Sequence, residues 1–188
     1  MVQQGTRQTV AEFEAFLALP ENRDRLFELI DGEIVEKMPT EQHGEIAAFL
    51  TVEIGIFLKQ NPIGRVGQEI RHRLPGDEFN AYLPDVSVRR DIDRPAVSEG
   101  AVPHMPALAI EVKSRDDTFR LMRRKAEYYL ANGSQLVWLV FPENRQVEVY
   151  SSHANDIVTL TEQDTLDGGE VLPGFSLKVA DIFQVPQY

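Results

Sequence analysis

Two charged residues stand in an otherwise apolar stretch of the chain, "PALAIEVKS" at positions 106–114. Glu111 and Lys113 are two residues apart, so they share one face of a β-strand, because side chains alternate across a strand. Asp85 occupies a similar place, directly ahead of the apolar run "VSV". If the two strands are neighbours with their polar sides facing alike, two carboxylates and an ammonium group converge at one point.

Such a group has a definite chemistry. Two carboxylates that lie close together repel one another, and either a proton or a divalent cation relieves the repulsion. Carboxylate oxygens suit Mg²⁺ or Mn²⁺, and a lysine beside such a cation can orient water and stabilise charge on a phosphate. This is the apparatus of metal-assisted phosphodiester hydrolysis. The alternative is a surface pair of Glu111 and Lys113 without a special role, with Asp85 as a turn residue.

The strands that must position these residues are predicted at 81–90 and 107–114, with another at 64–74. Leu108, Ile110 and Val112 would face the core, opposite the charged residues. The segment 134–152 is predicted to be a hairpin, and its strand "LVWLV" is apolar enough to be buried on both faces. Two further strands within 25–38 are joined by Asp31-Gly32, a pair typical of two-residue hairpin turns.

Three helices are predicted between the strands. The first begins with the capping-box pattern of Thr9 to Glu12 and stops before Pro20, and the second covers 39–62. The third follows Asp116-Asp117 as candidate N-cap and closes at Asn132-Gly133. The tail is predicted to give short strands and a last turn that packs Ile182 and Phe183. The alternation of elements predicts a single α/β domain over residues 1–188.

Composition excludes several classes of protein. The net charge of −11 argues against a general nucleic-acid binder, and the lack of cysteine excludes disulfides and Cys-ligated zinc. No apolar run approaches the roughly 18 residues that a membrane span needs, so we expect no membrane partner. The N-terminus has no targeting pattern, and the expected location is cytoplasmic.

The motifs together resemble a known group of enzymes. Pro84-Asp85, followed by Glu111-Val112-Lys113 on an apolar strand, is similar to the PD-(D/E)XK nuclease signature. The segments "ELIDGEIVE", "PTEQHGEI", "RRKAEYYLANG", "LVWLVFPENRQVEVY" and "LPGFSL" occur in the order seen in the Uma-two family of bacterial restriction-endonuclease-like proteins. The resemblance covers residues 10–183 and implies a restriction-endonuclease-like α/β fold, with a central mixed β-sheet flanked by helices.

The resemblance also implies roles for individual residues. Asp85 and Glu111 would be the ligands of a Mg²⁺ or Mn²⁺ ion, with the Val112 carbonyl as a further ligand, and Lys113 would be the catalytic lysine that orients the attacking water. Related nucleases often add a carboxylate from an early helix, and Glu45 is the matching candidate. The alternative for Glu45 is a favourable charge in the first turn of a helix.

Other candidates surround this set. Lys125 and Tyr129 share one helix face, and similar nucleases place such residues along the site, but a lysine snorkelling beside a core tyrosine would look the same. His43 could line the site or be a capping or surface residue, and Gln68 could line the cleft. The helix that follows the motif carries three arginines that could contact phosphates or form a solvated face: Arg120, Arg123 and Arg124.

The predicted function is that of a metal-dependent endonuclease that hydrolyses phosphodiester bonds in nucleic acid, with DNA as the favoured substrate. A homodimer is an expectation from the family. One alternative is a catalytically inactive nuclease-fold module for binding or protein interaction, and another is hydrolysis of a different phosphoester. The sequence departs from the family at Phe141, where an Asp is usual, and this departure puts any role of that acid in doubt.

Overall fold

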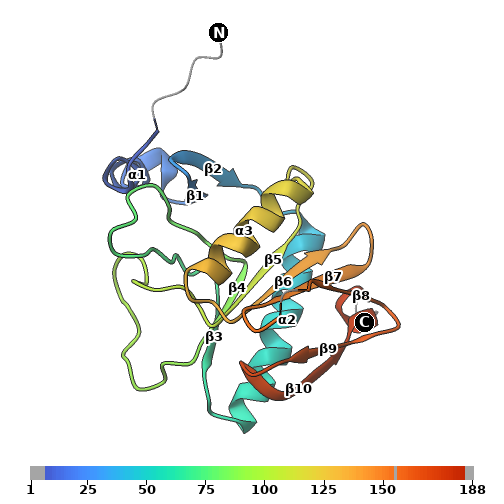
Figure 1. Ribbon diagram of the computed structural model, residues 1–188. Coiled ribbons are helices and arrows are strands. Elements are labelled where there is room, and N and C mark those ends of the chain that lie inside the picture. The colour runs from blue at the N-terminus through green and yellow to red at the C-terminus, as the bar shows by residue number, and fades with distance from the viewer. Residues whose placement is uncertain (1–6, 155, 185–188) are drawn as a thin grey trace.

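A six-stranded mixed sheet forms the centre of the fold (Figure 1), in the computed structural model that describes residues 7–154 and 156–184. The strand order is β3–β4–β5–β6–β7–β8. β5 and β6 are parallel, and the other neighbouring strands are antiparallel. The strands are β3 (Arg65–Gln68), β4 (Val86–Arg89), β5 (Leu108–Val112), β6 (Leu136–Phe141), β7 (Gln146–Ser151) and β8 (Val158–Thr161).

One long helix lies on each face of this sheet (Figure 1). α2 (Glu41–Gln60) packs Leu50 and Ile54 on the face that carries Ile110 and its neighbours. α3 (Phe119–Ala131) connects the parallel strands β5 and β6 and packs Ala126 against Ala109 and its neighbours on the other face. Both faces are therefore buried, and a charged side chain on either face needs a partner. In the described part of the chain, the helices fall short of the length and apolarity that a membrane crossing requires.

The N-terminal segment forms a separate small layer. α1 (Val10–Leu17) begins at a Thr9 capping box, as predicted, and the short 3₁₀ helix η1 (Pro20–Asn22) follows. β1 (Leu26–Ile30) and β2 (Glu33–Lys37) pair antiparallel through a turn at Asp31 and Gly32, with φ of 49° and 81°. A β-bridge between Leu29 and Ala81 is one of several contacts that attach this hairpin to the rest of the fold. The sequence prediction of a two-residue hairpin turn is confirmed.

The C-terminal segment packs on the α2 side of the sheet. β9 (Thr165–Gly168) and β10 (Leu172–Lys178) form a second hairpin, and the short helix α4 (Val179–Ile182) follows. Leu166, Phe175 and Ile182 belong to the same hydrophobic core as α2. The predicted packing of Ile182 and Phe183 is confirmed, because both are buried.

The structure corrects three local predictions. The strand predicted over 64–74 ends at Gln68, because Glu69 adopts a φ of 50°, which breaks the extended backbone. Beyond it, His72 makes only isolated bridges. The strand predicted over 81–90 is limited to β4, and the N-cap of α3 is Thr118, since Asp117 instead accepts hydrogen bonds from Ser114.

Candidate active site

Neighbouring strands bring Asp85 and Glu111 together. β4 and β5 pair antiparallel with Val86 opposite Ile110. One residue further along this register, Asp85 lies across from Glu111 at the end of the strand pair. Each of the two is only 2% exposed. The structure therefore joins two of the three groups that the strand pattern predicted to converge.

Three groups hold the Asp85 carboxylate. The backbone N–H of Val112 donates to Oδ2 at 2.6 Å, and Nε2 of His43, in the first turn of α2, lies 3.0 Å from the same oxygen. Nζ of Lys37, at the end of β2, lies 2.5 Å from Oδ1. Because these partners come from three different elements, the carboxylate has a fixed orientation.

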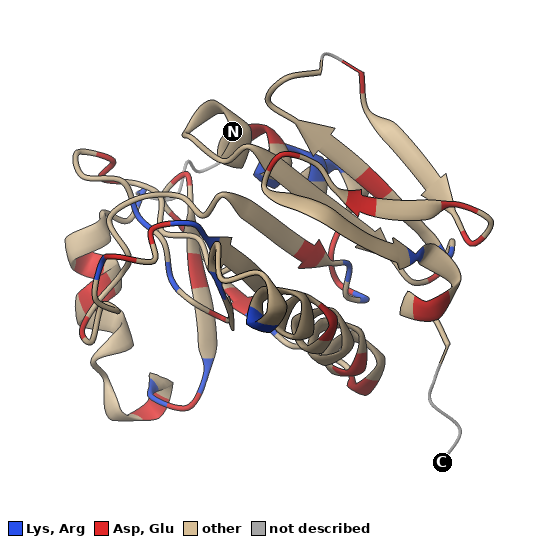
Figure 2. Cartoon of the chain, turned by 90° about the horizontal axis from the view of Figure 1, so that it is seen from below, with Lys and Arg blue, Asp and Glu red and all other residues tan. Residues whose placement is uncertain are grey.

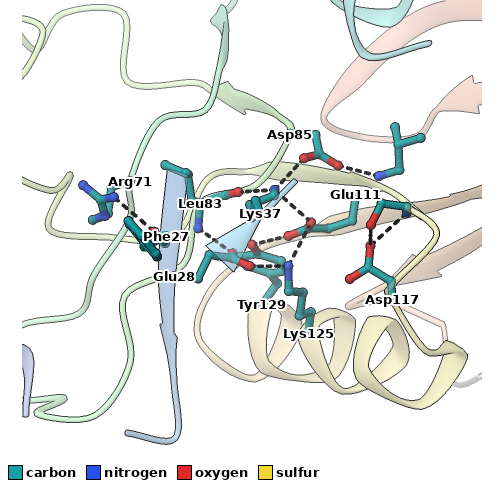
Figure 3. Close-up of polar contacts among 12 residues, drawn as sticks. Phe27, Glu28, Lys37, Arg71, Leu83, Asp85, Glu111, Asp117, Lys125 and Tyr129 are labelled. Carbon is teal, nitrogen blue, oxygen red and sulfur yellow. Dashed lines mark hydrogen bonds and ion pairs between the residues drawn. The ribbon is translucent and has the colours of Figure 1, made fainter. Parts of the chain in front are cut away.

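Glu111 takes most of its partners from α3 (Figure 3). The Tyr129 hydroxyl donates to Oε1 at 2.7 Å, and Nζ of Lys125 donates to Oε2 at 3.1 Å. Nζ of Lys37 lies 3.7 Å from the same Oε2. Lys125 and Tyr129 share one face of the helix, as predicted, and the structure places both against the predicted ligand.

Sequence reasoning missed two members of this cluster, Glu28 and Lys37. Glu28 is 1% exposed, its Oε2 lies 2.5 Å from Lys125 Nζ, and its Oε1 accepts the Leu83 N–H at 2.8 Å. Lys37 Nζ donates to the Leu83 carbonyl at 2.7 Å. A signal for Glu28 was present, since it is the single charged residue of the apolar strand "LFELI". The strand "EIVEK" has charges typical of a solvent-facing strand, so its pattern gave no such signal for Lys37.

The buried charges shift one another's pKa values. Burial would raise the pKa of Asp85, but Lys37 and His43 outweigh burial and hold that pKa below its usual value. Burial raises the pKa of Glu111 to about 7, although Lys125 and Lys37 oppose the rise. For both lysines burial is outweighed by the nearby carboxylates, and their pKa values are raised. At neutral pH Asp85 is therefore an anion and both lysines are cations.

A cavity of about 90 Å³ opens beside these groups. Its ionisable lining is strongly acidic, with seven Asp and Glu residues against two lysines. The acids are Glu28, Glu36, Glu69, Asp85, Glu111, Asp116 and Asp117, and the lysines are Lys37 and Lys125. Such a lining favours a cation over an anion in the cavity.

Lys113 lies apart from the carboxylate pair. Its Nζ is 3.3 Å from Glu143 Oε2, 3.2 Å from the Ser114 carbonyl, and 5.5 Å from the centre of the Phe119 ring. The strand β5 ends at Val112, so the alternation that predicted a shared face does not extend to Lys113. The ammonium group that contacts both carboxylates is that of Lys37.

Phe141, where the resemblance led us to expect an acid, contacts Phe119, the ring that lies near Lys113. Phe141 is 2% exposed, and its ring stacks on Phe119 with centroids 4.9 Å apart and planes at 24°. An apolar contact therefore occupies the position where an acid is usual.

The remaining candidates divide into two groups. His43 and Val112 line the cavity, while Glu45 and Gln68 are exposed and are not among its lining residues. The alternative reading of Glu45, a favourable charge near the start of a helix, fits its exposed position.

The three arginines of α3 all lie on its exposed side. Arg123 pairs with Glu148 at 2.5 Å, and Arg124 pairs with Asp31. Two of the three arginines therefore form ion pairs with acidic side chains. This arrangement favours a solvated, ion-paired helix face over a free phosphate-binding surface. Arg120 is exposed on the same helix.

The donor set fits a hard divalent cation. The carboxylates of Asp85 and Glu111 approach one point, marked by Lys37 Nζ, and Mg²⁺ commonly takes one or two protein carboxylates together with waters. The described residues contain no group of three His, Cys, Asp or Glu side chains arranged as a metal site. Water or substrate oxygens would therefore complete the coordination.

Comparisons with known proteins agree with the geometry. The sequence profile of the Uma2 family, described as "Putative restriction endonuclease", matches residues 13–180. A solved structure of a "putative nuclease belonging to DUF820" from Anabaena variabilis is similar, with a TM-score of 0.77 and 25% sequence identity, over 93% of this chain and 97% of that chain. No curated protein sequence matches the chain. The family match spans most of the chain, and the chain belongs to the Uma2 (Uma-two) family, with a restriction-endonuclease-like fold.

Proposed function

We propose that this protein is a metal-dependent endonuclease that hydrolyses phosphodiester bonds in nucleic acid, with Asp85 and Glu111 at its catalytic centre. One observation carries the proposal: two buried carboxylates from neighbouring strands lie within 3.7 Å of one ammonium nitrogen, beside an acidic cavity. Membership of a family described by nuclease activity supports the same class of reaction.

Four side chains of the site have a role in this proposed reaction. Asp85 and Glu111 would hold a Mg²⁺ or Mn²⁺ ion, with the Val112 carbonyl as a further ligand. When bound, the ion supplies positive charge that polarises a phosphate oxygen and stabilises the charge that develops on it. Tyr129 and Lys125 keep the Glu111 carboxylate oriented, so that it does not have to reorganise during the reaction.

The role of Lys113 in orienting the attacking water stays a prediction. Its ammonium group would have to turn away from Glu143, which is half-exposed and which holds it at 3.3 Å. The preference for DNA and the homodimer also stay predictions. Arg120 is the arginine of α3 that has no ion pair among the described residues, and it is the candidate for phosphate contacts.

Cleavage assays with single-stranded and double-stranded DNA and with RNA, each with Mg²⁺ or Mn²⁺, test the proposal. We expect cleavage that EDTA abolishes. Asp85→Asn and Glu111→Gln should each lower the rate by about 100-fold or more, since even the outer partners of metal ligands cost up to that much. Glu45→Gln is the matched control, because Glu45 is an exposed acid outside the cavity lining, and its rate should match the unmodified protein. Metal-independent cleavage, or cleavage that survives Asp85→Asn, would contradict the proposal.

A nuclease-fold module without turnover is the second candidate. The observation that favours it is the ammonium group of Lys37, which already neutralises the carboxylate pair. Such a module would bind neither Mg²⁺ nor Mn²⁺ at this site, so calorimetric titration with Mn²⁺ separates the two candidates.

A further inference from the structure

Lys37 occupies the place between the two carboxylates that the proposed metal needs. Its Nζ lies 2.5 Å from Asp85 Oδ1 and 3.7 Å from Glu111 Oε2, and it also donates to the Leu83 carbonyl at 2.7 Å. Figure 3 shows its ammonium group between Asp85 and Glu111. A divalent cation placed between these two carboxylate oxygens would lie close to this nitrogen.

Charge balance decides whether both cations can stay. The cluster has three buried carboxylates (Glu28, Asp85 and Glu111) and two buried ammonium groups (Lys37 and Lys125). With all three carboxylates ionised, the state in which Glu111 can bind a metal, the formal charge is −1. A divalent cation added beside Lys37 would bring three positive centres together in a buried space, with a net charge of +1. If Lys37 leaves as the metal enters, the formal charge is zero, which costs least in a medium of low polarity.

Lys37 is also the member of the cluster that can leave. Its side chain is 13% exposed, against 4% for Lys125 and 1–2% for the carboxylates. It is the last residue of β2, and the next residue, Met38, is 60% exposed at the start of the link to α2. Lys125 is instead held from two sides by Glu28 at 2.5 Å and Glu111 at 3.1 Å.

The cavity offers Lys37 a destination. Glu69 and Asp116 line the same cavity, and both are exposed. A lysine side chain is long and flexible, so its ammonium group can move toward these acids while its backbone stays in the strand. The exchange would then keep every charge near an opposite one.

We propose that Lys37 is an internal counter-ion that closes the metal site and exchanges with the divalent cation. The proposal rests on the proposed function, because it concerns the metal of that site. Lys37 keeps the carboxylates neutralised while the metal is absent, and entry of the metal moves its ammonium group to the mouth of the cavity. Metal affinity is therefore lower than two buried carboxylates alone would give.

Titration of the full-length protein with Mn²⁺ tests this exchange. Lys37→Met should lower the Mn²⁺ dissociation constant by about tenfold or more, within the range typical of coupling between two ligands. Lys59→Met is the control, since it removes the same charge from an exposed lysine of α2 that is not among the lining residues of the cavity, and its effect should be less than threefold. Equal affinities of the unmodified protein and Lys37→Met would overturn the exchange and leave the nuclease proposal standing. If neither protein binds Mn²⁺, both proposals fail.

A second measurement needs no variant. Acetylation of lysines in the unmodified protein, followed by mass spectrometry, should label Lys37 slowly without metal and at least about fivefold faster with saturating Mn²⁺. Lys125, which stays between Glu28 and Glu111, should remain protected in both conditions. Continued protection of Lys37 with Mn²⁺ bound would show that the ammonium group stays in place, and the proposal would be wrong.

Discussion

The carboxylate of Glu111 depends on side chains that its own strand does not supply. Tyr129 and Lys125 come from α3 and Lys37 comes from β2, and together they satisfy a group that is 2% exposed. A buried carboxylate without such partners costs several kcal/mol. The orientation of the Glu111 carboxylate therefore depends on β5, which carries it, and on α3 and β2, which supply its partners.

His72 is a buried residue outside this site whose titration affects stability. It is fully buried, His104 O lies 2.8 Å from its Nδ1, and its Nε2 has no hydrogen-bond partner among the described residues. Burial lowers the pKa of His72 to about 4. The hydrogen bond with the His104 carbonyl opposes this shift, while the charges of His104 and Arg89 add to it and that of Asp91 opposes it. The folded protein therefore keeps the ring neutral where the unfolded chain already binds a proton.

The contribution of His72 to the stability of the folded protein decreases at low pH. Stability from this residue is complete above the unfolded pKa of about 6.5 and falls as the pH drops toward 4, by up to about 3 kcal/mol. Urea unfolding at pH 7, 6, 5 and 4 measures this loss. His72→Asn keeps a donor for the His104 carbonyl but cannot titrate, so its stability should fall less over the same range. Parallel curves for the two proteins would contradict the assignment to His72.

The hairpin β1–β2 is an element whose turn admits few residues. Gly32 has a φ of 81°, and a Cβ there would lie 2.7 Å from Arg7 Cβ. Because this hairpin carries Glu28 and Lys37, its geometry fixes two of the five members of the buried charge cluster.

Gly32→Ala tests this constraint. We expect it to destabilise the protein by more than about 2 kcal/mol, because the close contact with Arg7 adds to the roughly 1–2 kcal/mol that a left-handed alanine costs. Gly76→Ala is the control, because Gly76 has a φ of 89° but open space around its Cβ position. It should cost about 1 kcal/mol, at the lower end of that range. Thermal unfolding of both variants makes the comparison, and equal losses would mean that the contact with Arg7 has no effect.

Local patterns were sufficient for most individual elements. The capping box at Thr9, the turn at Asp31 and Gly32, and the apolar run of β6 each depend on neighbours within a few residues. The alternation in β5 also correctly placed Leu108, Ile110 and Val112 on the face that packs against α2. Pairing of β4 with β5 was a condition of the prediction, because the residues within one strand do not specify which strand lies beside it.

Contacts between distant elements could not be predicted in this way. Lys37 meets Asp85 across 48 positions, and Glu28 meets Leu83 across 55. These contacts depend on how the β1–β2 hairpin docks at the end of the central sheet, and alternation within a strand contains no information about docking. The sequence also could not show that Lys113 points away from the carboxylate pair, because this depends on the end of β5 at Val112.

The charge of the whole molecule opposes binding to nucleic acid. The net charge is −11, and Figure 2 shows acidic positions on helices, strands and loops alike. A phosphate backbone that approaches the acidic cavity meets repulsion unless cations neutralise the carboxylates.

Binding of a short DNA duplex should therefore require a divalent cation. Fluorescence anisotropy at 150 mM NaCl should give a dissociation constant at least about tenfold lower with Ca²⁺ than with EDTA, a difference of about 1.4 kcal/mol. Asp85→Asn should lose most of the Ca²⁺ effect, while Glu45→Gln should keep it. Tight binding in EDTA would indicate a basic surface that functions without the cavity.

The β1–β2 hairpin can open locally, and this opening would affect the charge cluster before the whole protein unfolds. The hairpin is a two-stranded unit of its own, joined to the loop before β4 by the Leu29–Ala81 bridge, whereas Asp85 and Glu111 belong to the large sheet. Its other attachments include the buried contacts of Glu28 and Lys37 with Leu83 and Lys125, which belong to the charge cluster itself. Local units of this kind can open before the whole protein unfolds. Partial unfolding of the hairpin would scatter the charge cluster while the six-stranded sheet stays intact. Mild heat or low denaturant would then abolish the activity proposed for this site before the six-stranded sheet unfolds.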